Sequence, residues 1–296
     1  MTVDLCMWTW NGEKTLGAVL QRINNVVPSG KVNQRLIIDD HSSDKTRSIA
    51  ETYGWNVVNN RGTGISDGAN TALDLVETPT FCSFEQDLLL SEDWWQKVVP
   101  LLDRKDVAAA SGIRHQYPSL TMRKLHEYTA ERYVKWRSGL PIYLNTEMRV
   151  KAAMSWGRTL DNTIYKTDIL REMGGFPDLQ TPGGIDTVLT FLYINAGYEW
   201  FVDFNVVSQH LNKTFRGELR CQFNYGSCYD AIAAFVPGLP VNLRAQAIRF
   251  LYSPIAAVHP AVSKRCPSIV FAYPLIRFNT LRGLFHSRRK QVCKKT

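Results

Sequence analysis

Two patterns of apolar residues alternate along the first part of the chain. Short continuous apolar runs predict buried strands, and between them apolar residues recur at helical spacing, as at Leu16, Val19, Leu20 and Ile23. The predicted strands cover 3–8, 35–39, 55–58, 80–84 and 107–111. Strands that alternate with helices predict an α/β fold, with a mostly parallel, Rossmann-like sheet that is flanked by helices.

The remainder of the chain is patterned less regularly. We expect Asn11 to cap the first helix, 62–68 to form a flexible loop, and 112–160 to be irregular and helical. A second block of strands and helices is expected at 160–213. Beyond Gly217 the pattern predicts short amphipathic helices that are interrupted by prolines. These prolines are Pro237, Pro240, Pro254, Pro260, Pro267 and Pro274.

Polar residues gather where the predicted strands end. Ligands of open α/β sheets bind at the carboxyl ends of the strands, so a functional site in this fold should be polar at these positions. Four successive strand ends meet this condition, and we expect their side chains to converge on one site. The residues are Thr9, Trp10, Asn11, Asp39, Asp40, Asn60, Arg61, Glu85, Gln86 and Asp87.

Charge is distributed unevenly along the chain. Residues 1–218 carry 23 Lys and Arg against 26 Asp and Glu, whereas residues 219–296 carry 12 Lys and Arg and a single acid, Asp230. Basic residues beside apolar and aromatic ones suit an interfacial segment on an anionic membrane. A helical extension packed on the rest of the protein, with a loose basic tail, is the alternative. The excess positive charge lies outside the predicted cleft, which argues against nucleic acid as a partner.

The ends of the chain and its cysteines indicate a compartment. The N-terminus enters an apolar strand without a preceding basic segment, so a signal peptide is not expected. No uncharged run reaches the roughly 18 residues that a membrane-spanning helix needs. The six cysteines lack zinc-ligand spacing, which favours a reducing compartment. We therefore expect a cytoplasmic protein that is peripheral on the cytoplasmic face of the membrane.

Two groups of carboxylates indicate metal and nucleotide chemistry. Glu85 and Asp87 lie two residues apart at a strand end, and carboxylate oxygens suit Mg²⁺ or Mn²⁺, which commonly bridge substrate phosphates. A solvated turn explains this triplet equally well when it is considered alone. Asp39 and Asp40 end another strand, where a carboxylate can accept hydrogen bonds from a base or ribose. The start of the following helix favours anions.

The segment 36–46, Leu-Ile-Ile-Asp-Asp-His-Ser-Ser-Asp-Lys-Thr, resembles the strand and loop signature of family 2 glycosyltransferases of the GT-A fold. Other segments are similar to further motifs of this family, in the same order, over about residues 3–215. They are Thr9-Trp10-Asn11-Gly12-Glu13, the Asn, Gly, Ala and Asn of 60–70, Phe84-Glu85-Gln86-Asp87 in place of the Asp-x-Asp, Gly174-Gly175-Phe176, Asp186 and His210.

The resemblance implies a donor site with a divalent metal, Mn²⁺ or Mg²⁺. Asp87 would bind the metal that bridges the donor diphosphate, and His210 stands where the family often has a metal-contacting His. Glu85 replaces the usual first Asp of the motif and would contact ribose or metal. The other residues that would hold the nucleotide sugar, of UDP or GDP type, are Thr9, Trp10, Asn11, Glu13, Asp39, Asp40, Arg61, Asn70 and Gln86.

The resemblance also implies the reaction. Asp186 is the candidate general base, because inverting transfer needs a carboxylate to take the proton of the acceptor hydroxyl as it attacks the anomeric carbon. A lipid-phosphate acceptor would arrive ionised, and Asp186 would then act through positioning or metal contact. A simple helix cap is the alternative for Asp186. The acceptor side would include Trp156, Asp161 and Asn162.

The sequence therefore predicts a metal-dependent, inverting glycosyltransferase whose acceptor is a lipid phosphate, a lipid-linked glycan or a surface glycan. The GT-A catalytic domain would cover 1–218, with a nucleotide-sugar half at 1–111 and an acceptor half at 112–218. A basic, amphipathic helical extension, in contact with a membrane or packed on the catalytic domain, would follow at 219–296.

Two other classes of protein are the alternatives. A nucleotidyltransferase would be expected to carry a Gly-rich, basic loop after the first strand, but the loop at Thr9 to Glu13 is aromatic and acidic. A non-catalytic nucleotide-sugar-binding protein would not need both Asp87 and Asp186.

Overall fold

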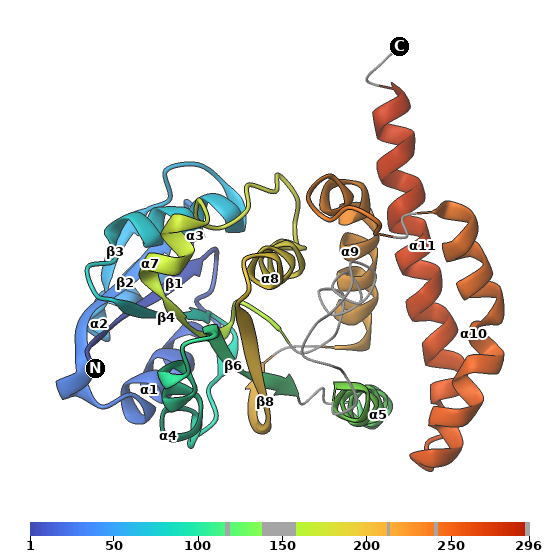
Figure 1. The fold of residues 1–296 in the computed structure, drawn as a ribbon, viewed down its shortest axis with the longest axis horizontal. Helices are drawn as coiled ribbons and strands as arrows, with labels where there is room; N and C mark the ends of the chain where they lie inside the picture. Colours follow the sequence, from blue (N-terminus) through green and yellow to red (C-terminus); the bar gives the residue numbers. More distant parts are fainter. Residues whose placement is uncertain (116–118, 138–157, 212–213, 240–241, 294–296) are drawn as a thin grey trace. The chain divides into compact units, whose positions relative to one another are not determined.

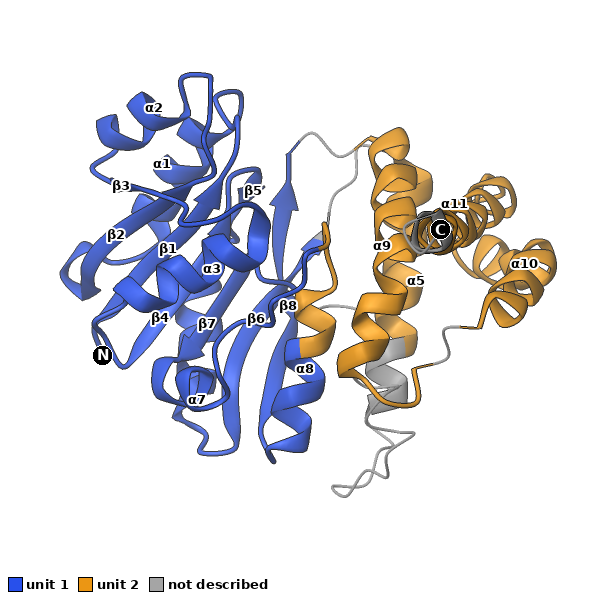
Figure 2. Ribbon diagram, turned by 90° about the horizontal axis from the view of Figure 1, so that it is seen from above, with its two compact units in different colours: residues 1–115, 157–180, 189–212 blue, residues 116–156, 181–188, 213–296 orange. Residues whose placement is uncertain are grey.

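A computed structural model of the chain describes residues 1–115, 119–137, 158–211, 214–239 and 242–293 (Figure 1). The chain forms two compact units, which are distinguished by colour in Figure 2. The first unit takes residues from 1–115, 157–180 and 189–212, and the second from 116–156, 181–188 and 213–296.

The first unit is built on a mixed sheet of eight strands in the order β3-β2-β1-β4-β7-β6-β8-β5. β1 pairs in parallel with β2 and β4, β2 with β3, and β6 with β8, whereas β7 and β5 run antiparallel to their neighbours. All five predicted strands are present. The strands are β1 (Val3–Thr9), β2 (Val32–Asp39), β3 (Asn56–Asn59), β4 (Thr80–Glu85), β5 (Leu88–Leu89), β6 (Val107–His115), β7 (Asn162–Lys166) and β8 (Glu199–His210).

Helices flank this sheet, which confirms the predicted α/β fold (Figure 1). The helices that begin in the first unit are α1 (Leu16–Val26), α2 (Thr46–Thr52), α3 (Gly64–Leu75), α4 (Trp94–Val98) and α7 (Thr167–Glu172), with the 3-10 helices η1 (Ser29–Lys31) and η2 (Val99–Asp103). Helix α8 (Ile185–Asn195) begins in the second unit and ends in the first.

The sheet buries apolar side chains on both faces. On one face, residues of β1 such as Leu5 and Met7 pack with the predicted stripe of α1, which includes Leu16 and Leu20. The other face is aromatic, and its rings contact one another in stacked or edge-on pairs. These rings belong to Trp8, Phe81, Tyr165, Phe176 and Trp200. Burial on both faces explains why the strands read as continuous apolar runs.

Two local expectations are wrong. Asn11 does not cap α1, whose N-cap is Thr15; the Asn11 side chain instead accepts a hydrogen bond from Ser43 N (2.9 Å). The segment 62–68 is not a flexible loop, because α3 begins at Gly64. Its first turn is stabilised by Asp67, whose carboxylate accepts a hydrogen bond from Thr63 N (2.8 Å).

The second unit is helical. Its helices are α5 (Leu120–Arg137), the first turn of α8, α9 (Phe215–Phe235), α10 (Leu243–Ser263) and α11 (Ile269–Cys293). A small core of Met122, Leu125, Ala257, Ile269 and Ile276 joins α5, α10 and α11. α5 thus belongs to the same compact unit as the C-terminal helices. The predicted boundary at residue 218, between a catalytic domain and an extension, concerns function and stays a prediction.

The expectation of short, proline-broken helices is wrong for three prolines, whereas Pro237 and Pro267 lie between helices as expected. Pro254 and Pro260 lie inside α10, and Pro274 lies inside α11. A proline leaves the carbonyl four residues before it without its helical donor. For Pro254 that carbonyl is Phe250 O, and the Ser253 hydroxyl donates to it (2.5 Å). A neighbouring side chain therefore replaces the lost hydrogen bond and lets the helix continue.

α9 and α11 approach each other closely at two glycines. A Cβ atom at Gly226 would overlap Thr280 O, and one at Gly283 would overlap Phe223 O. Only glycine therefore allows this contact between the two backbones. Within the described part of the chain, no helix combines the length and apolar character that crossing a bilayer requires.

Candidate active site

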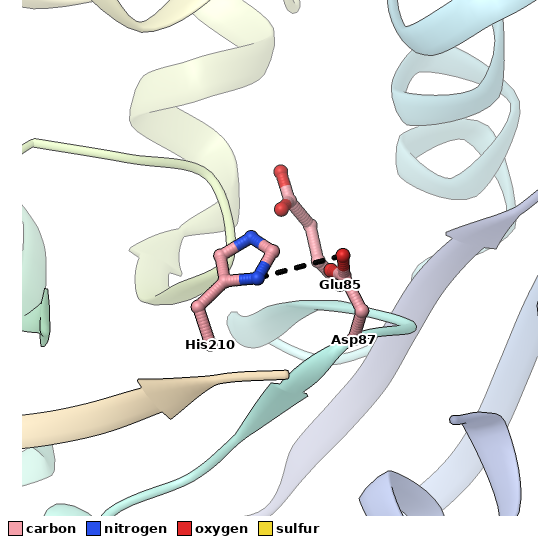
Figure 3. Close-up of side chains that lie close together, drawn as sticks. All are labelled: Glu85, Asp87 and His210. Atoms are coloured by element: carbon pink, nitrogen blue, oxygen red, sulfur yellow. Dashed lines mark ion pairs between the residues drawn. The ribbon is translucent and has the colours of Figure 1, made fainter. Parts of the chain in front are cut away.

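Three potential metal ligands lie together at strand ends of the first unit, as Figure 3 shows. Glu85 ends β4, Asp87 directly precedes β5, and His210 ends β8. One ligand atom from each residue lies within 4.8 Å of the others. His210 Nδ1 is 3.5 Å from Asp87 Oδ2. The structure thus brings together Asp87 and His210, the two residues that the sequence predicts as ligands.

Strand pairing holds Asp87 beside His210. β5 runs antiparallel to the end of β8, so that Leu88 lies opposite His210. Leu211 N also donates a hydrogen bond to Asp87 O (2.7 Å). The short strand β5 therefore has a clear role, since its backbone hydrogen bonds place two side chains from distant parts of the sequence next to each other.

The His210 ring is oriented by its surroundings. Its Nδ1 lies 3.0 Å from Leu211 O, and since a carbonyl oxygen can only accept, we assign the ring proton to Nδ1. This tautomer leaves the lone pair of the ring on Nε2. Histidine ligands in metalloproteins are commonly fixed by such a contact to a carbonyl or carboxylate.

The three residues fit a divalent cation. Ligand bonds to Mg²⁺ are about 2.1 Å long, so opposite ligands of one ion lie roughly 4 Å apart, close to the span of this cluster. Two carboxylates and an imidazole suit Mn²⁺, whereas an imidazole is a less favoured ligand for Mg²⁺. The Glu85 and Asp87 side chains are 27% and 33% exposed, which leaves them within reach of a substrate.

Arg114 of β6 adds a positive charge beside this cluster. Its guanidinium lies 3.6 Å from Glu85 Oε2 and 2.6 Å from Asp161 Oδ2. Asp161 is fully buried and also accepts a hydrogen bond from the Thr159 hydroxyl (2.5 Å). The sequence prediction missed Arg114 because it ended the strand at 111, whereas β6 continues to His115. A longer predicted strand would have placed Arg114 at its polar end.

The two aspartates that end β2 are bound by neighbouring strand ends. Asp39 is buried, and its carboxylate accepts hydrogen bonds from the Thr9 hydroxyl (3.4 Å) and from Ser42 N (3.1 Å). Asp40 accepts hydrogen bonds from the Asn60 amide (3.0 Å) and from Gly64 N (3.0 Å). The predicted convergence of Thr9, Asp39, Asp40 and Asn60 is therefore present.

Side chains also hold the loop after β1. Gln86 forms two hydrogen bonds of 2.9 Å with the backbone of Trp10: its Oε1 accepts from Trp10 N, and its Nε2 donates to Trp10 O. The Glu13 carboxylate accepts from Lys45 N (3.3 Å) at the start of α2. Asn11 is likewise engaged with Ser43. Three predicted donor-site residues thus shape the loop, while the Trp10 side chain is 62% exposed.

Asp44 makes the stability of this loop dependent on pH. Partial burial opposes its ionisation, but hydrogen bonds from the Thr46 hydroxyl, Glu13 N and Thr46 N together lower its pKa. A carboxylate with a lowered pKa stabilises the folded state above its unfolded pKa of about 3.9, and this contribution is lost as the pH falls through the folded pKa.

We therefore expect Asp44→Ala to lower the free energy of unfolding at neutral pH by about 1 to 2 kcal/mol, the usual cost of losing hydrogen bonds to a partly exposed carboxylate. The difference in the free energy of unfolding between the variant and the unmodified protein should become smaller as the pH falls below about 4. Urea unfolding at several pH values measures it. Glu51→Ala, an exposed carboxylate in α2, is the control and should change stability by less than about 0.5 kcal/mol. A difference that stays constant with pH would contradict the assignment.

Asn70 has a structural partner. Its side chain donates to Phe176 O and accepts from Phe176 N, both at 2.9 Å. Gly175 has a positive φ of 86°, and a Cβ atom there would lie 2.6 Å from the Asn70 oxygen. Two motifs of the resemblance, Asn70 and Gly174-Gly175-Phe176, are therefore joined by hydrogen bonds between the Asn70 side chain and the Phe176 backbone. Arg61 is exposed and forms an ion pair with Asp74 (2.5 Å).

The predicted acceptor-side residues differ in their surroundings. Trp156 lies outside the described residues. Asp161 and Asn162 are both fully buried, and Asn162 O accepts a hydrogen bond from Trp94 Nε1 (2.9 Å) inside the sheet. Of these residues, Asp161 is linked to the metal-ligand cluster, through Arg114.

Asp186 lies in the second unit, in the first turn of α8. Its Oδ1 accepts a hydrogen bond from Thr187 N (2.8 Å). α9 of the same unit supplies Tyr225 nearby, and burial, together with the negative charges of Tyr229 and Asp186, raises the pKa of the Tyr225 hydroxyl. The Asp186 carboxylate is half-buried, and its place in the first turn of α8 is compatible with both a base and a helix cap.

The family model for glycosyl transferase family 2 matches residues 4–174, more than half of the chain. The chain therefore belongs to glycosyl transferase family 2. It is 26% identical over 206 residues to the O-antigen chain rhamnosyltransferase WbaN of Salmonella anatum. This match covers 66% of the chain and 62% of the length of that relative.

Solved structures confirm the predicted GT-A fold. The mannosyltransferase PcManGT from Pyrobaculum calidifontis, in complex with GDP-Man and Mn²⁺, is 16% identical, with a TM-score of 0.64 over 97% of this chain and 86% of that one. Glucosyl-3-phosphoglycerate synthase from Mycobacterium tuberculosis, in complex with Mn²⁺, UDP-Glc and phosphoglyceric acid, is also 16% identical. Its TM-score is 0.58, over 81% of this chain and 80% of that one.

Proposed function

We propose that this family 2 glycosyltransferase is metal-dependent and inverting, and that it transfers a sugar from a nucleotide-diphosphate donor to a lipid-linked or surface-glycan acceptor. The observation that carries the proposal is the cluster of Glu85, Asp87 and His210 at the strand ends where this fold binds ligands. A Mn²⁺ or Mg²⁺ ion held there would supply positive charge to the diphosphate leaving group.

The chain's own residues would bind and orient the donor. The exposed Trp10 ring offers a surface on which a base can stack. Asp39 and Asp40 lie at adjacent strand ends and would accept hydrogen bonds from the base or ribose. Arg114, held by Asp161, would place its guanidinium toward the donor phosphates, for which a guanidinium is well suited.

The acceptor and the base are the further parts of the proposal. The similarity to an O-antigen chain rhamnosyltransferase supports a lipid-linked or glycan acceptor. Asp186 would take the proton of the acceptor hydroxyl, and in-line attack on the anomeric carbon would invert its configuration. A lipid-linked acceptor would place the reaction at the cytoplasmic face of a membrane, so the peripheral location expected from the sequence belongs to this proposal.

Donor binding and hydrolysis test the proposed function. UDP-, GDP- and dTDP-linked sugars, including a rhamnosyl donor, are assayed by calorimetry and by release of the nucleoside diphosphate, with Mn²⁺, with Mg²⁺ and with EDTA. We expect one donor class to bind about tenfold or more tightly when metal is present, since each 1.4 kcal/mol of added interaction gives a tenfold change. Equal binding of every donor in EDTA would exclude metal dependence.

The products separate the alternatives. Transfer to an acceptor with inverted anomeric configuration, read by NMR of the product, supports the proposed reaction. Release of pyrophosphate from a nucleoside triphosphate would instead indicate a nucleotidyltransferase. Tight donor binding without turnover on any acceptor would indicate a non-catalytic nucleotide-sugar-binding protein.

A further inference from the structure

Helix α10 of the second unit buries small and polar residues and exposes large apolar ones, the reverse of what is expected of a helix in water. Its buried positions are small or polar and include Gln246, Ser253, Ala257 and Ala261. A surface helix of a water-soluble protein instead turns its large apolar residues toward the core. The small residues let α10 pack against α5 and α11, but they leave its large apolar side chains on the other side.

Those apolar side chains form a stripe along the exposed side of α10. They lie three or four residues apart, so that they share one face of the helix. The most exposed are Leu251 (73%), Val262 (72%) and Ile255 (63%). The members of this α10 stripe are Ile248, Leu251, Tyr252, Ile255, Val258 and Val262.

The neighbouring helix α11 repeats the feature. Phe271 is 75% exposed, and Leu275, Phe278 and Phe285 follow at helical spacing on the same side of the helix. Its buried side carries small residues such as Ala272 together with the larger Ile269, Ile276 and Leu284. Scattered exposed apolar residues are ordinary on protein surfaces, whereas exposed apolar faces on two adjacent helices mark a surface that contacts another apolar phase.

The positive charge around these apolar faces indicates which kind of partner they contact. The chain beyond residue 218 carries 12 Lys and Arg against one acid, Asp230, and Asp230 is paired with Arg288 (3.0 Å). Arg244 and Arg249 are exposed on α10, and Arg265 is exposed just after it. An apolar stripe bordered by cations matches an anionic lipid surface, in which acyl chains lie beneath negatively charged headgroups. Two copies of the same cationic surface would repel each other.

We propose that the α10 stripe, with the exposed face of α11, is a docking surface for an anionic lipid bilayer. The helices lie on the membrane rather than across it, which agrees with the absence of a membrane-spanning helix in the described part of the chain. The apolar side chains enter the interface between headgroups and acyl chains, and the arginines bind lipid phosphates. This inference rests on the peripheral location that the proposed function includes and names the surface responsible, but lipid docking itself does not depend on which reaction the first unit performs.

Vesicle binding by the full chain tests the proposal. Vesicles of phosphatidylcholine alone, or of phosphatidylcholine with phosphatidylglycerol, are sedimented with the protein at low and high salt. We expect binding to the anionic vesicles, weakened by salt. The combined variant Leu251→Gln, Ile255→Gln and Val262→Gln should reduce partitioning by about tenfold or more, since it removes the most exposed part of the stripe. Arg249→Gln and Arg265→Gln should each reduce it about fivefold.

The control variant combines Leu120→Gln and Phe235→Gln, two exposed apolar residues of the same unit that lie on other helices, and it should bind vesicles normally. Absence of vesicle binding, or equal binding by the triple variant, would overturn the proposal. It would also be overturned if the unmodified protein were a dimer by analytical ultracentrifugation and the triple variant a monomer, with neither bound to vesicles. Donor binding in solution, measured on the same samples, tests the proposed function separately.

Discussion

We expect replacement of Asp87 with Ala to abolish metal-dependent donor binding and to lower sugar transfer by about a thousandfold or more. Asp87 Oδ2 lies 3.5 Å from His210 Nδ1, and β5 fixes the position of Asp87 by backbone pairing. A bound cation contributes several kcal/mol to the stabilisation of charge on a leaving diphosphate, and each 1.36 kcal/mol corresponds to a tenfold change in rate. Titration of Mn²⁺ by electron paramagnetic resonance, followed by donor calorimetry, measures both losses.

The control for this variant is Asp103→Ala, which removes an exposed carboxylate at the end of η2 in the same unit. It should bind Mn²⁺ and donor as the unmodified protein does. Both variants should unfold at similar urea concentrations, because both side chains reach solvent. Unchanged Mn²⁺-dependent donor binding in Asp87→Ala would move the metal site elsewhere and remove the main support of the proposed function.

Replacing Asp186 with Asn should leave donor binding intact and lower transfer by about 100- to 10,000-fold, the range of a general base. Asn keeps the shape of Asp and its ability to accept from Thr187 N, but it cannot take a proton. Transfer by the unmodified protein should fall at low pH as the base is protonated, and the variant should lack this fall. Rates of single-turnover transfer, measured across pH, report the loss of the base. Calorimetry of donor binding shows whether donor affinity is unchanged.

Asp168→Asn is the matched control, because Asp168 also lies in the first turn of a helix, α7, and is exposed. If Asp186 only stabilises a helix start, both variants should lose about 0.5 kcal/mol of stability and transfer at the normal rate. Normal transfer by Asp186→Asn would therefore assign the residue to the helix and require another base. A loss restricted to Asp186→Asn supports the proposed reaction.

Asp87 and Asp186 were predicted on different grounds. Asp87 could be located from the apolar run that precedes it, because a strand end in an α/β sheet is visible in the sequence. Its partner His210 follows another strand, and only the pairing of β5 with β8 shows that the two are adjacent. Asp186 was predicted from the family motif alone, and its position in the first turn of α8 leaves the proposed base for experiment to test.

Other residues show why side-chain roles are harder to predict than strands. Gln86 and Asn70 were both predicted to bind the nucleotide sugar, yet their amides are hydrogen-bonded to the backbones of Trp10 and Phe176. A polar residue near a site can bind a ligand or hold the loop that binds it, and the two roles require the same residue types. The choice depends on which backbone groups lie within about 3 Å after folding.

The C-terminal helices illustrate a second limit. Prolines predicted breaks, but α10 continues through Pro254 because Ser253 satisfies the freed carbonyl of Phe250. The apolar and basic composition was visible in the sequence and left two readings, a packed extension and a membrane surface. The folded α10 turns small and polar residues inward and large apolar residues outward, an orientation that composition does not contain.

The sequence by itself determined the α/β fold, the strands that carry the site and the family, because apolar periodicity and short motifs are local properties of the chain. The tertiary structure alone decided that Asp87, Glu85 and His210 form one cluster and that Arg114 joins Glu85 to the buried Asp161. These contacts join residues far apart in the chain, and their geometry follows from strand order and register. A metal site needs ligand atoms within a few ångströms, and only the folded sheet brings them that close.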